Sequence, residues 1–203
     1  MSPLFGRRAS SPEQEFWAWF ARNEADLFEF EKDRQAAFDR VGAALRKVHP
    51  RLTFEFGPLE GGRRCFVISA DGIREAFPSV QALHAAAPEL PRWRFVKFRP
   101  RRRTILNVAH GGHALDPEGI RFDLEPDRGK AGITAYVPDL RRENTGSFIA
   151  PLFLILDQAL GEFDVEANVG FIHLLPAEAA PAGAVGIGEL PEAFDQLITA
   201  LRS

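Results

Sequence analysis

Apolar residues recur along the chain with two different periods, and each change of period marks a new element. A helical period runs over residues 16–30 and again over residues 38–48. Ser11 and Pro12 precede the first stretch in the order of an N-cap and a first-turn proline. Pro50 ends the second stretch, because the residue before a proline disfavours the α region. The pattern therefore predicts a helical N-terminal segment.

Two later stretches repeat the order strand, strand, helix, strand. The first is predicted at residues 52–56, 64–69, 80–87 and 92–98. The second is predicted at residues 120–125, 133–137, 148–159 and 163–174. A final helix is predicted over residues 190–201, where apolar side chains again follow the helical period.

These elements define a fold class. Hairpins pair strands antiparallel, and helix-bearing connections lay helices on a sheet face. We predict an α+β fold built as a two-layer sandwich, with the two strand-strand-helix-strand units between an N-terminal helical segment and a C-terminal helix. Residues 1–11 are predicted as a flexible tail and residues 12–203 as a single domain, in which 51–100 and 119–175 suggest a pseudo-duplication. Whether the strands form one continuous sheet stays open.

The predicted core is rich in phenylalanine. The residues expected to be buried are Phe16, Phe20, Phe54, Phe56, Phe66, Ile68, Phe122, Phe148, Leu152 and Phe194. Trp17 and Trp19 could cover an apolar ligand or a partner, although an aromatic stripe on a helix is more typical of core. Exposure of either indole would point to a partner surface.

Composition narrows the class of protein. Of the 203 residues, 45% are hydrophobic and 26% are charged, which is typical of a folded globular chain. The most apolar stretch, residues 148–156, is far shorter than the roughly 20 residues of a membrane-spanning helix. Residues 1–11 lack the apolar centre of a signal peptide, and the single Cys65 cannot form an internal disulfide. We expect a cytoplasmic protein that does not enter a membrane.

Charge is unevenly distributed. Residues 1–110 contain 19 basic and 13 acidic residues, a net charge of +6, whereas residues 111–203 contain 6 and 15, a net charge of −9. The asymmetry favours either docking of one half on the other or a basic surface for an anion.

The densest basic segment spans residues 92–103, where seven cations and no acid are interleaved with aromatic residues. Guanidinium groups neutralise phosphates and exposed rings stack on bases. Arg99, Arg101, Arg102 and Arg103 are therefore candidate ligands for an anion or a nucleic acid.

A structural role for the same arginines is the favoured alternative, because charge runs are usually solvated faces. Two sets of alternating acids, each assigned to a strand, could pair with them across a sheet. The sets are Asp123, Glu125 and Asp127, and Glu162, Asp164 and Glu166. Nucleic acid is accordingly the less favoured partner.

A second candidate site lies in a glycine-containing segment. His110, His113 and Asp116 place two imidazoles and a carboxylate within seven residues, and zinc accepts such ligands. The spacing matches no standard zinc motif, and histidine is common in loops. The segment therefore supports a metal-dependent hydrolase only as the alternative function.

Other catalytic motifs are absent from the sequence. It contains no Gly-x-Ser-x-Gly nucleophile motif, no phosphate-binding loop and no complete dinucleotide fingerprint. We therefore predict no cofactor and lean against an enzyme.

Three segments resemble an uncharacterised family of bacterial proteins. They are the Phe-Trp-Ala-Trp-Phe helix at residues 16–20, Ile-Ser-Ala-Asp-Gly at 68–72 and Ala-Pro-Glu-Leu-Pro-Arg-Trp at 87–93. The resemblance implies a bacterial, stand-alone cytoplasmic protein and transfers no functional residue.

These observations favour a function through surfaces rather than through assembled catalytic groups. The leading hypothesis is a non-catalytic cytoplasmic binding or regulatory protein that acts through a protein or polyanion partner. The alternative is the metal-dependent hydrolase built on His110, His113 and Asp116.

Overall fold

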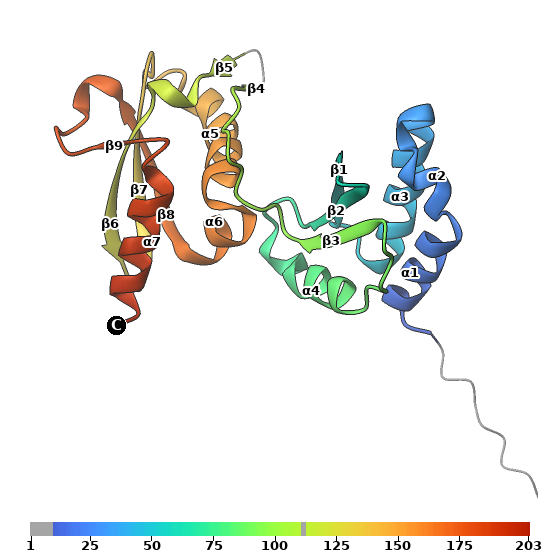
Figure 1. Ribbon diagram of the computed structural model, residues 1–203. Helices are drawn as coiled ribbons and strands as arrows, with labels where there is room; N and C mark the ends of the chain where they lie inside the picture. Colours follow the sequence, from blue (N-terminus) through green and yellow to red (C-terminus); the bar gives the residue numbers. More distant parts are fainter. Residues whose placement is uncertain (1–9, 111–112) are drawn as a thin grey trace, which may run out of the picture. The chain divides into compact units, whose positions relative to one another are not determined.

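The computed structural model describes residues 10–110 and 113–203, and it divides the chain into two compact units (Figure 1). Unit 1 is Met1–Phe98 and unit 2 is Arg99–Ser203. Each unit has its own hydrophobic core, and the described strands form separate sheets of three, two and four strands. The predicted α+β class is therefore confirmed. Residues 1–9 of the expected flexible tail lie outside the described part of the chain.

Unit 1 begins with a helical segment, as predicted. Its elements are α1 (Pro12–Arg22), α2 (Glu24–Phe28), the 3-10 helix η1 (Phe30–Asp33) and α3 (Arg34–Val48). Ser11 caps α1 in a capping box, in which Ser11 and Gln14 each accept the other's backbone N–H through a side-chain oxygen. The first-turn proline adds a fixed φ at the same point, so the start of α1 is encoded locally.

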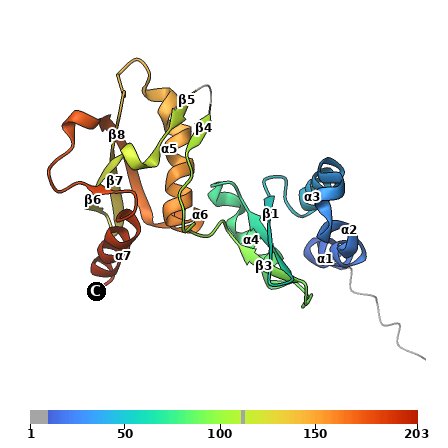
Figure 2. The same cartoon turned by 45° about the horizontal axis from the view of Figure 1, so that its top comes forward.

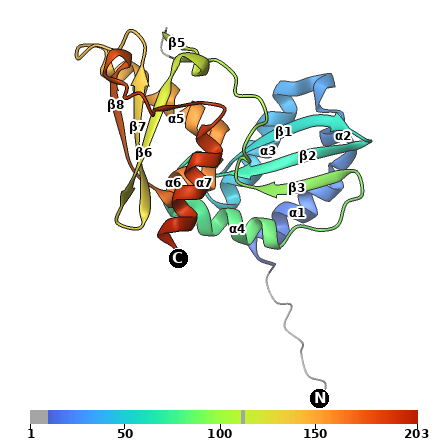
Figure 3. The same ribbon diagram turned by 60° about the vertical axis from the view of Figure 1, so that its left-hand side comes forward.

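The sheet of unit 1 has the strand order β1-β2-β3. It contains β1 (Thr53–Glu60), β2 (Arg63–Ser69) and β3 (Trp93–Lys97), and the 3-10 helix η2 (Arg74–Ala76) and α4 (Phe77–Ala85) connect β2 to β3. β1 pairs with β2 antiparallel, and β3 pairs with β2 parallel. Figure 2 and Figure 3 show the strands from two sides.

Aromatic rings fill the core of unit 1. Phe20 of α1 lies with its ring centroid 5.1 Å from that of Phe66 in β2 and 5.0 Å from that of Trp93 in β3. Eight of the ten residues expected to be buried are buried, while Phe54 and Phe56 in the edge strand β1 are half-buried.

Unit 2 repeats the same order of elements. A hairpin of β4 (Val108–His110) and β5 (His113–Leu115) and the 3-10 helix η3 (Pro117–Gly119) precede it. Its main elements are β6 (Arg121–Asp127), β7 (Lys130–Val137), α5 (Thr145–Leu160), α6 (Glu162–Asn168), β8 (Val169–Pro176), the 3-10 helix η4 (Ala177–Ala179), β9 (Val185–Gly186) and α7 (Leu190–Leu201). The strand order is β8-β7-β6-β9, with β8 parallel to β7 and β6 antiparallel to it. Both predicted strand-strand-helix-strand units and the closing helix are thus present.

One predicted strand is wrong in its first half. Residues 162–168 form the helix α6, and the strand begins only at Val169. Gly161 ends α5 with φ of +85°, a conformation that favours glycine, and α6 starts directly after it. Two acids in the first turn of α6 favour the helix, and Val165 is buried in the core.

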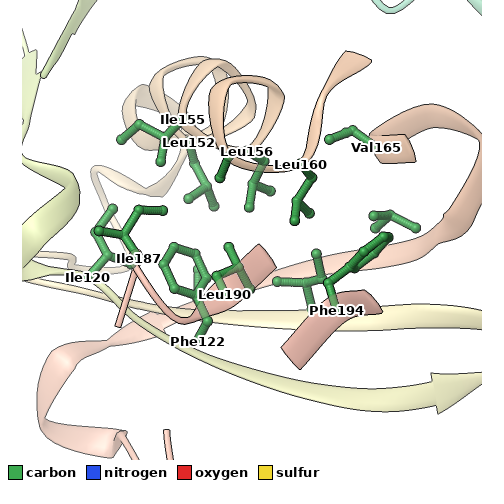
Figure 4. Packing of buried hydrophobic residues seen from close by; sticks show 14 of the residues in the cluster. Ile120, Phe122, Leu152, Ile155, Leu156, Leu160, Val165, Ile187, Leu190 and Phe194 are labelled. Atoms are coloured by element: carbon green, nitrogen blue, oxygen red, sulfur yellow. The ribbon is translucent and has the colours of Figure 1, made fainter. Parts of the chain in front are cut away.

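Side chains from α5 and α7 form the core of unit 2 together with one face of its sheet (Figure 4). Phe122 of β6, Leu152 and Leu156 of α5 and Phe194 of α7 are among its fully buried members. Among the described residues, no helix combines the length and the apolar character needed to cross a bilayer.

Candidate functional site

Arg101, from the basic segment, is held by two carboxylates of unit 2. Its guanidinium nitrogens lie 2.9 Å from a carboxylate oxygen of Asp164 in α6 and 2.7 Å from one of Asp195 in α7. Its Nε donates a hydrogen bond to the Leu160 carbonyl at the end of α5. The charge of Arg101 is therefore compensated within unit 2, and the side chain contacts the C-terminal end of α5, the first turn of α6 and the middle of α7.

The pKa values at this ion pair move in opposite directions. The hydrogen bond from Arg101 lowers the pKa of Asp195, although partial burial opposes the shift. The hydrogen bond to Asp195 raises the pKa of Arg101. Both shifts favour the charged pair at neutral pH.

The other candidate arginines occupy different surroundings. The Arg99 backbone N–H donates to the buried carboxylate of Glu162, and the Glu162 N–H donates to the Arg99 carbonyl. The Arg102 N–H donates to the Gln158 carbonyl of α5, and the Arg103 side chain is exposed. Of the acids expected to pair with this segment, Asp164 does so from a helix rather than from a strand. An anion site made of all four arginines stays a prediction.

The histidine segment is described only in part. His110 and His113 are opposite each other in the backbone register of the β4-β5 hairpin, while Gly111 and Gly112, and the two imidazoles, lie outside what is described. The carboxylate of Asp116 accepts the N–H of Glu118 at 3.1 Å and so caps η3. The metal-dependent hydrolase stays a prediction, which stoichiometric metal in the purified protein would support.

Cys65 is an unreactive thiol by its surroundings. The residue is half-buried in β2, and burial raises the pKa of its thiol, with the nearby Arg94 opposing the shift. The neutral thiol is a poor nucleophile at neutral pH.

The main sheet of unit 2 has a second face that lies outside the hydrophobic core. We call it the open sheet face and define it by Asp123 and Glu125 of β6, Thr134 of β7, and Phe171 and His173 of β8. The register places Asp123 beside Thr134 and Thr134 beside His173, and it places Glu125 beside Gly132 and Gly132 beside Phe171. Because side chains alternate along a strand, all five point away from the face that carries Phe122 and Ile133. Figure 3 shows α5, α6 and α7 together on the other side of the sheet.

An aromatic pair occupies the β8 side of this face. A Cβ added to Gly132 would overlap ring atoms of Phe171, so the ring lies directly over the glycine. The Phe171 and His173 rings stack at a centroid distance of 4.3 Å and an interplanar angle of 29°. Because Gly132 has no side chain, the Phe171 ring can pack on the backbone of β7 at this position.

An acidic row occupies the β6 side. Asp123 and Glu125 are both exposed, and within the described part of the chain neither forms an ion pair. They are two residues apart on one strand, so their Cα atoms are about 6 to 7 Å apart. The open sheet face therefore combines an aromatic surface with two carboxylates that form no ion pair among the described residues, on a strand that also carries Arg121 on this face.

The sequence contains part of this site. The alternation of Asp123 and Glu125 with apolar residues predicted that both lie on one face of a strand, where they were expected to pair with the basic segment. Phe171 and His173 also alternate along a strand, but the sequence does not place β8 beside β7.

No family model matches the chain, and neither the curated proteins nor the solved structures contain a match.

Proposed function

We propose that the protein is a non-catalytic binding protein whose open sheet face takes a basic segment of a partner protein. The observation that carries this proposal is the acidic row of Asp123 and Glu125 beside the stacked rings of Phe171 and His173. Lysine or arginine side chains of a partner would neutralise the row, and apolar side chains would pack on the rings.

The dimensions of the face favour an amphipathic helix as the partner segment. Strands lie about 4.8 Å apart, so β6 and β8 are separated by about 10 Å. A helix with its side chains is about 10 to 12 Å across, so one helix covers both strands at once. Its basic side would face β6 and its apolar side would face β8.

The surface of the protein itself supports this choice of charge. Two carboxylates on one strand repel each other in the free protein, and a basic partner relieves that repulsion. A polyanion would instead meet like charge on this face. Of the two partners expected from the sequence, a protein or a polyanion, the open sheet face of unit 2 therefore favours a protein.

The test is an affinity capture with two forms of the protein that differ only in the charge of the open sheet face. Immobilised wild-type protein is compared with the double variant Asp123→Lys, Glu125→Lys by quantitative mass spectrometry of retained proteins, at low and at physiological salt. We expect one or more basic proteins to be retained by the wild type, more strongly at low salt, and lost by the double variant.

Glu143→Lys with Glu192→Lys is the matched control, because it also reverses two exposed acids of unit 2, both outside the open sheet face. It should retain the same proteins as the wild type. If no protein is lost by the double variant and retained by the control, the proposal is wrong.

A further inference from the structure

A groove in unit 1 lies between the two antiparallel helices α1 and α3, which are neighbours in Figure 1 and Figure 2. Its volume is about 610 Å³, within the range of small-molecule sites. Each helix contributes a stripe at the spacing i, i+3, i+4, i+7. The stripes are Glu15, Ala18, Trp19 and Arg22 on α1, and Arg40, Ala43, Ala44 and Lys47 on α3.

The middle of the groove is apolar. Trp19 is half-buried, and its ring centroid lies 5.9 Å from that of the buried Phe16. Ala43 and Ala44 stand opposite on α3, and their small side chains keep the groove open. An indole that is only partly covered by its own protein is a surface for an apolar group.

One end of the groove is cationic. Arg40 contacts Asp26 in α2, which lies four residues after Arg22, so Arg22 and Arg40 lie at the same end. The Arg40–Asp26 contact measures 3.4 Å between a partly exposed arginine and a largely exposed aspartate, and such a pair opens readily to another anion. Arg22 forms no ion pair within the described residues.

The other end of the groove has mixed charge. Lys47 lies there with Glu15, whose carboxylate accepts a hydrogen bond from the Ser10 hydroxyl at 2.8 Å. The groove therefore has a direction, with two arginines at one end, an apolar middle and a balanced pair at the other end.

We propose that this groove binds a single-chain amphipathic carboxylate of the fatty-acid class. The carboxylate lies between Arg22 and Arg40, where guanidinium groups can donate paired hydrogen bonds to its two oxygens. The acyl chain runs along Trp19, Ala43 and Ala44 towards Lys47. On α1 the lining of the groove extends from Pro12 to Arg22, about 15 Å at 1.5 Å per residue, which suits a chain of medium length. This site is independent of the open sheet face, because all of its residues belong to unit 1.

The first measurement is the binding of dodecanoate to the full chain below its micelle concentration, by calorimetry and by tryptophan fluorescence. Trp19 lines the groove while Trp17 and Trp93 are buried, so Trp19→Phe should abolish the fluorescence change. We expect saturable binding of one molecule per chain. Decanoate should bind about 15-fold more weakly, since each buried methylene contributes about fourfold. Dodecyltrimethylammonium, with the same chain and the opposite charge, should bind at least about tenfold more weakly.

The second measurement compares variants of the groove. Arg22→Ala with Arg40→Ala should weaken dodecanoate binding by about tenfold or more. Ala43→Phe should block the groove without removing a charge. Arg46→Ala, which removes an exposed arginine of α3 outside the groove, should bind as the wild type does. Circular dichroism verifies that each variant is folded.

Three results would overturn the proposal. They are the absence of saturable dodecanoate binding, equal affinity for the cationic amphiphile, and unchanged affinity in both the double arginine variant and a folded Ala43→Phe variant. Loss of partner capture at the open sheet face would leave all of these measurements unchanged, so the two proposals fail separately.

Discussion

Two buried tryptophans in the core of unit 1 differ in a single hydrogen bond. The Trp17 indole N–H donates to the Leu83 carbonyl of α4 at 2.7 Å, and Trp17 is 3% exposed. Trp93 is 2% exposed, and in the described part of the chain its indole N–H has no hydrogen-bond partner. Both rings belong to the same aromatic cluster, so the pair isolates the contribution of one donor.

We predict that Trp17→Phe destabilises the protein more than Trp93→Phe does. Both changes remove a similar amount of buried surface, but only Trp17→Phe leaves a buried carbonyl without its donor. The difference in the free energy of unfolding should be about 1 to 2 kcal/mol. Denaturant unfolding followed by circular dichroism measures it. Equal losses for the two variants would contradict this assignment of the hydrogen bond.

The local pattern predicted most of the buried residues correctly and left the role of Trp19 open. The helical period selects Phe16 and Phe20 because α1 packs one face on the sheet. Phe54 and Phe56 alternate as a strand requires, yet both are only half-buried in the edge strand β1. Trp19 lies beside the buried face of α1, and only the position of α3 makes it a wall of the groove.

At the scale of elements, the failed strand prediction at residues 163–168 has a local cause and a distant one. Glu162 to Glu166 alternate acid with apolar residues, a pattern that a short helix with one buried residue also produces. The contact from Arg101 to Asp164 then fixes the helix from a residue 63 positions earlier in the chain. The sequence pattern alone contains no information on that contact.

The open sheet face shows the same limit. The strand alternation of its acidic half in β6 was predicted, although the sequence suggested that these acids pair with the basic segment. Its aromatic half depends on the parallel pairing of β8 with β7, whose register shifts between Ala131 and Gly132. Such pairing connects segments separated by two helices, so short-range periodicity does not reveal it.

The Arg101 contacts predict a pH dependence for the stability of unit 2. Because Arg101 lowers the pKa of Asp195 in the folded protein, the unfolded chain binds a proton more readily at acidic pH. The stabilisation by this pair is therefore fully present above the ordinary aspartate pKa of about 3.9 and is lost as the pH falls through the lower folded value. It should be no more than about 1 kcal/mol, because Asp195 is largely exposed.

We expect the wild type to be more stable than Asp195→Asn at neutral pH and the difference to shrink below about pH 4. Chemical denaturation over this pH range measures the difference. Glu192→Gln, which removes another exposed acid of α7, is the control and should show no such narrowing. A gap that stays constant at acidic pH would mean that the pair does not stabilise the fold electrostatically.

At the scale of the whole molecule, the division into two units changes the meaning of the charge asymmetry. Counted by unit, residues 1–98 contain 15 basic and 13 acidic residues, a net charge of +2, and residues 99–203 contain 10 and 15, a net charge of −5. Four arginines that made the first half basic belong to the acidic unit, where Arg101 meets Asp164 and Asp195. The contrast between the halves is accordingly smaller than the sequence suggested.

The two units have separate cores, and the single domain expected over residues 12–203 stays a prediction that unfolding experiments can test. Phe20 and Phe122 are fully buried, one in each core. Truncating either to alanine should destabilise its own core by about 3 to 5 kcal/mol. Intrinsic fluorescence distinguishes the two units. All three tryptophans lie in unit 1, whereas unit 2 contains the single tyrosine, Tyr136.

We predict that the units unfold independently. Phe20→Ala should lower the denaturation midpoint of tryptophan fluorescence, whereas Phe122→Ala should leave that midpoint unchanged and still lower part of the transition seen by far-ultraviolet circular dichroism. Each variant is the control for the other, since the same chemical change is made in the other core. If both variants shift fluorescence and circular dichroism together by the same amount, the chain unfolds as one cooperative domain, because a single transition responds to destabilisation anywhere within it.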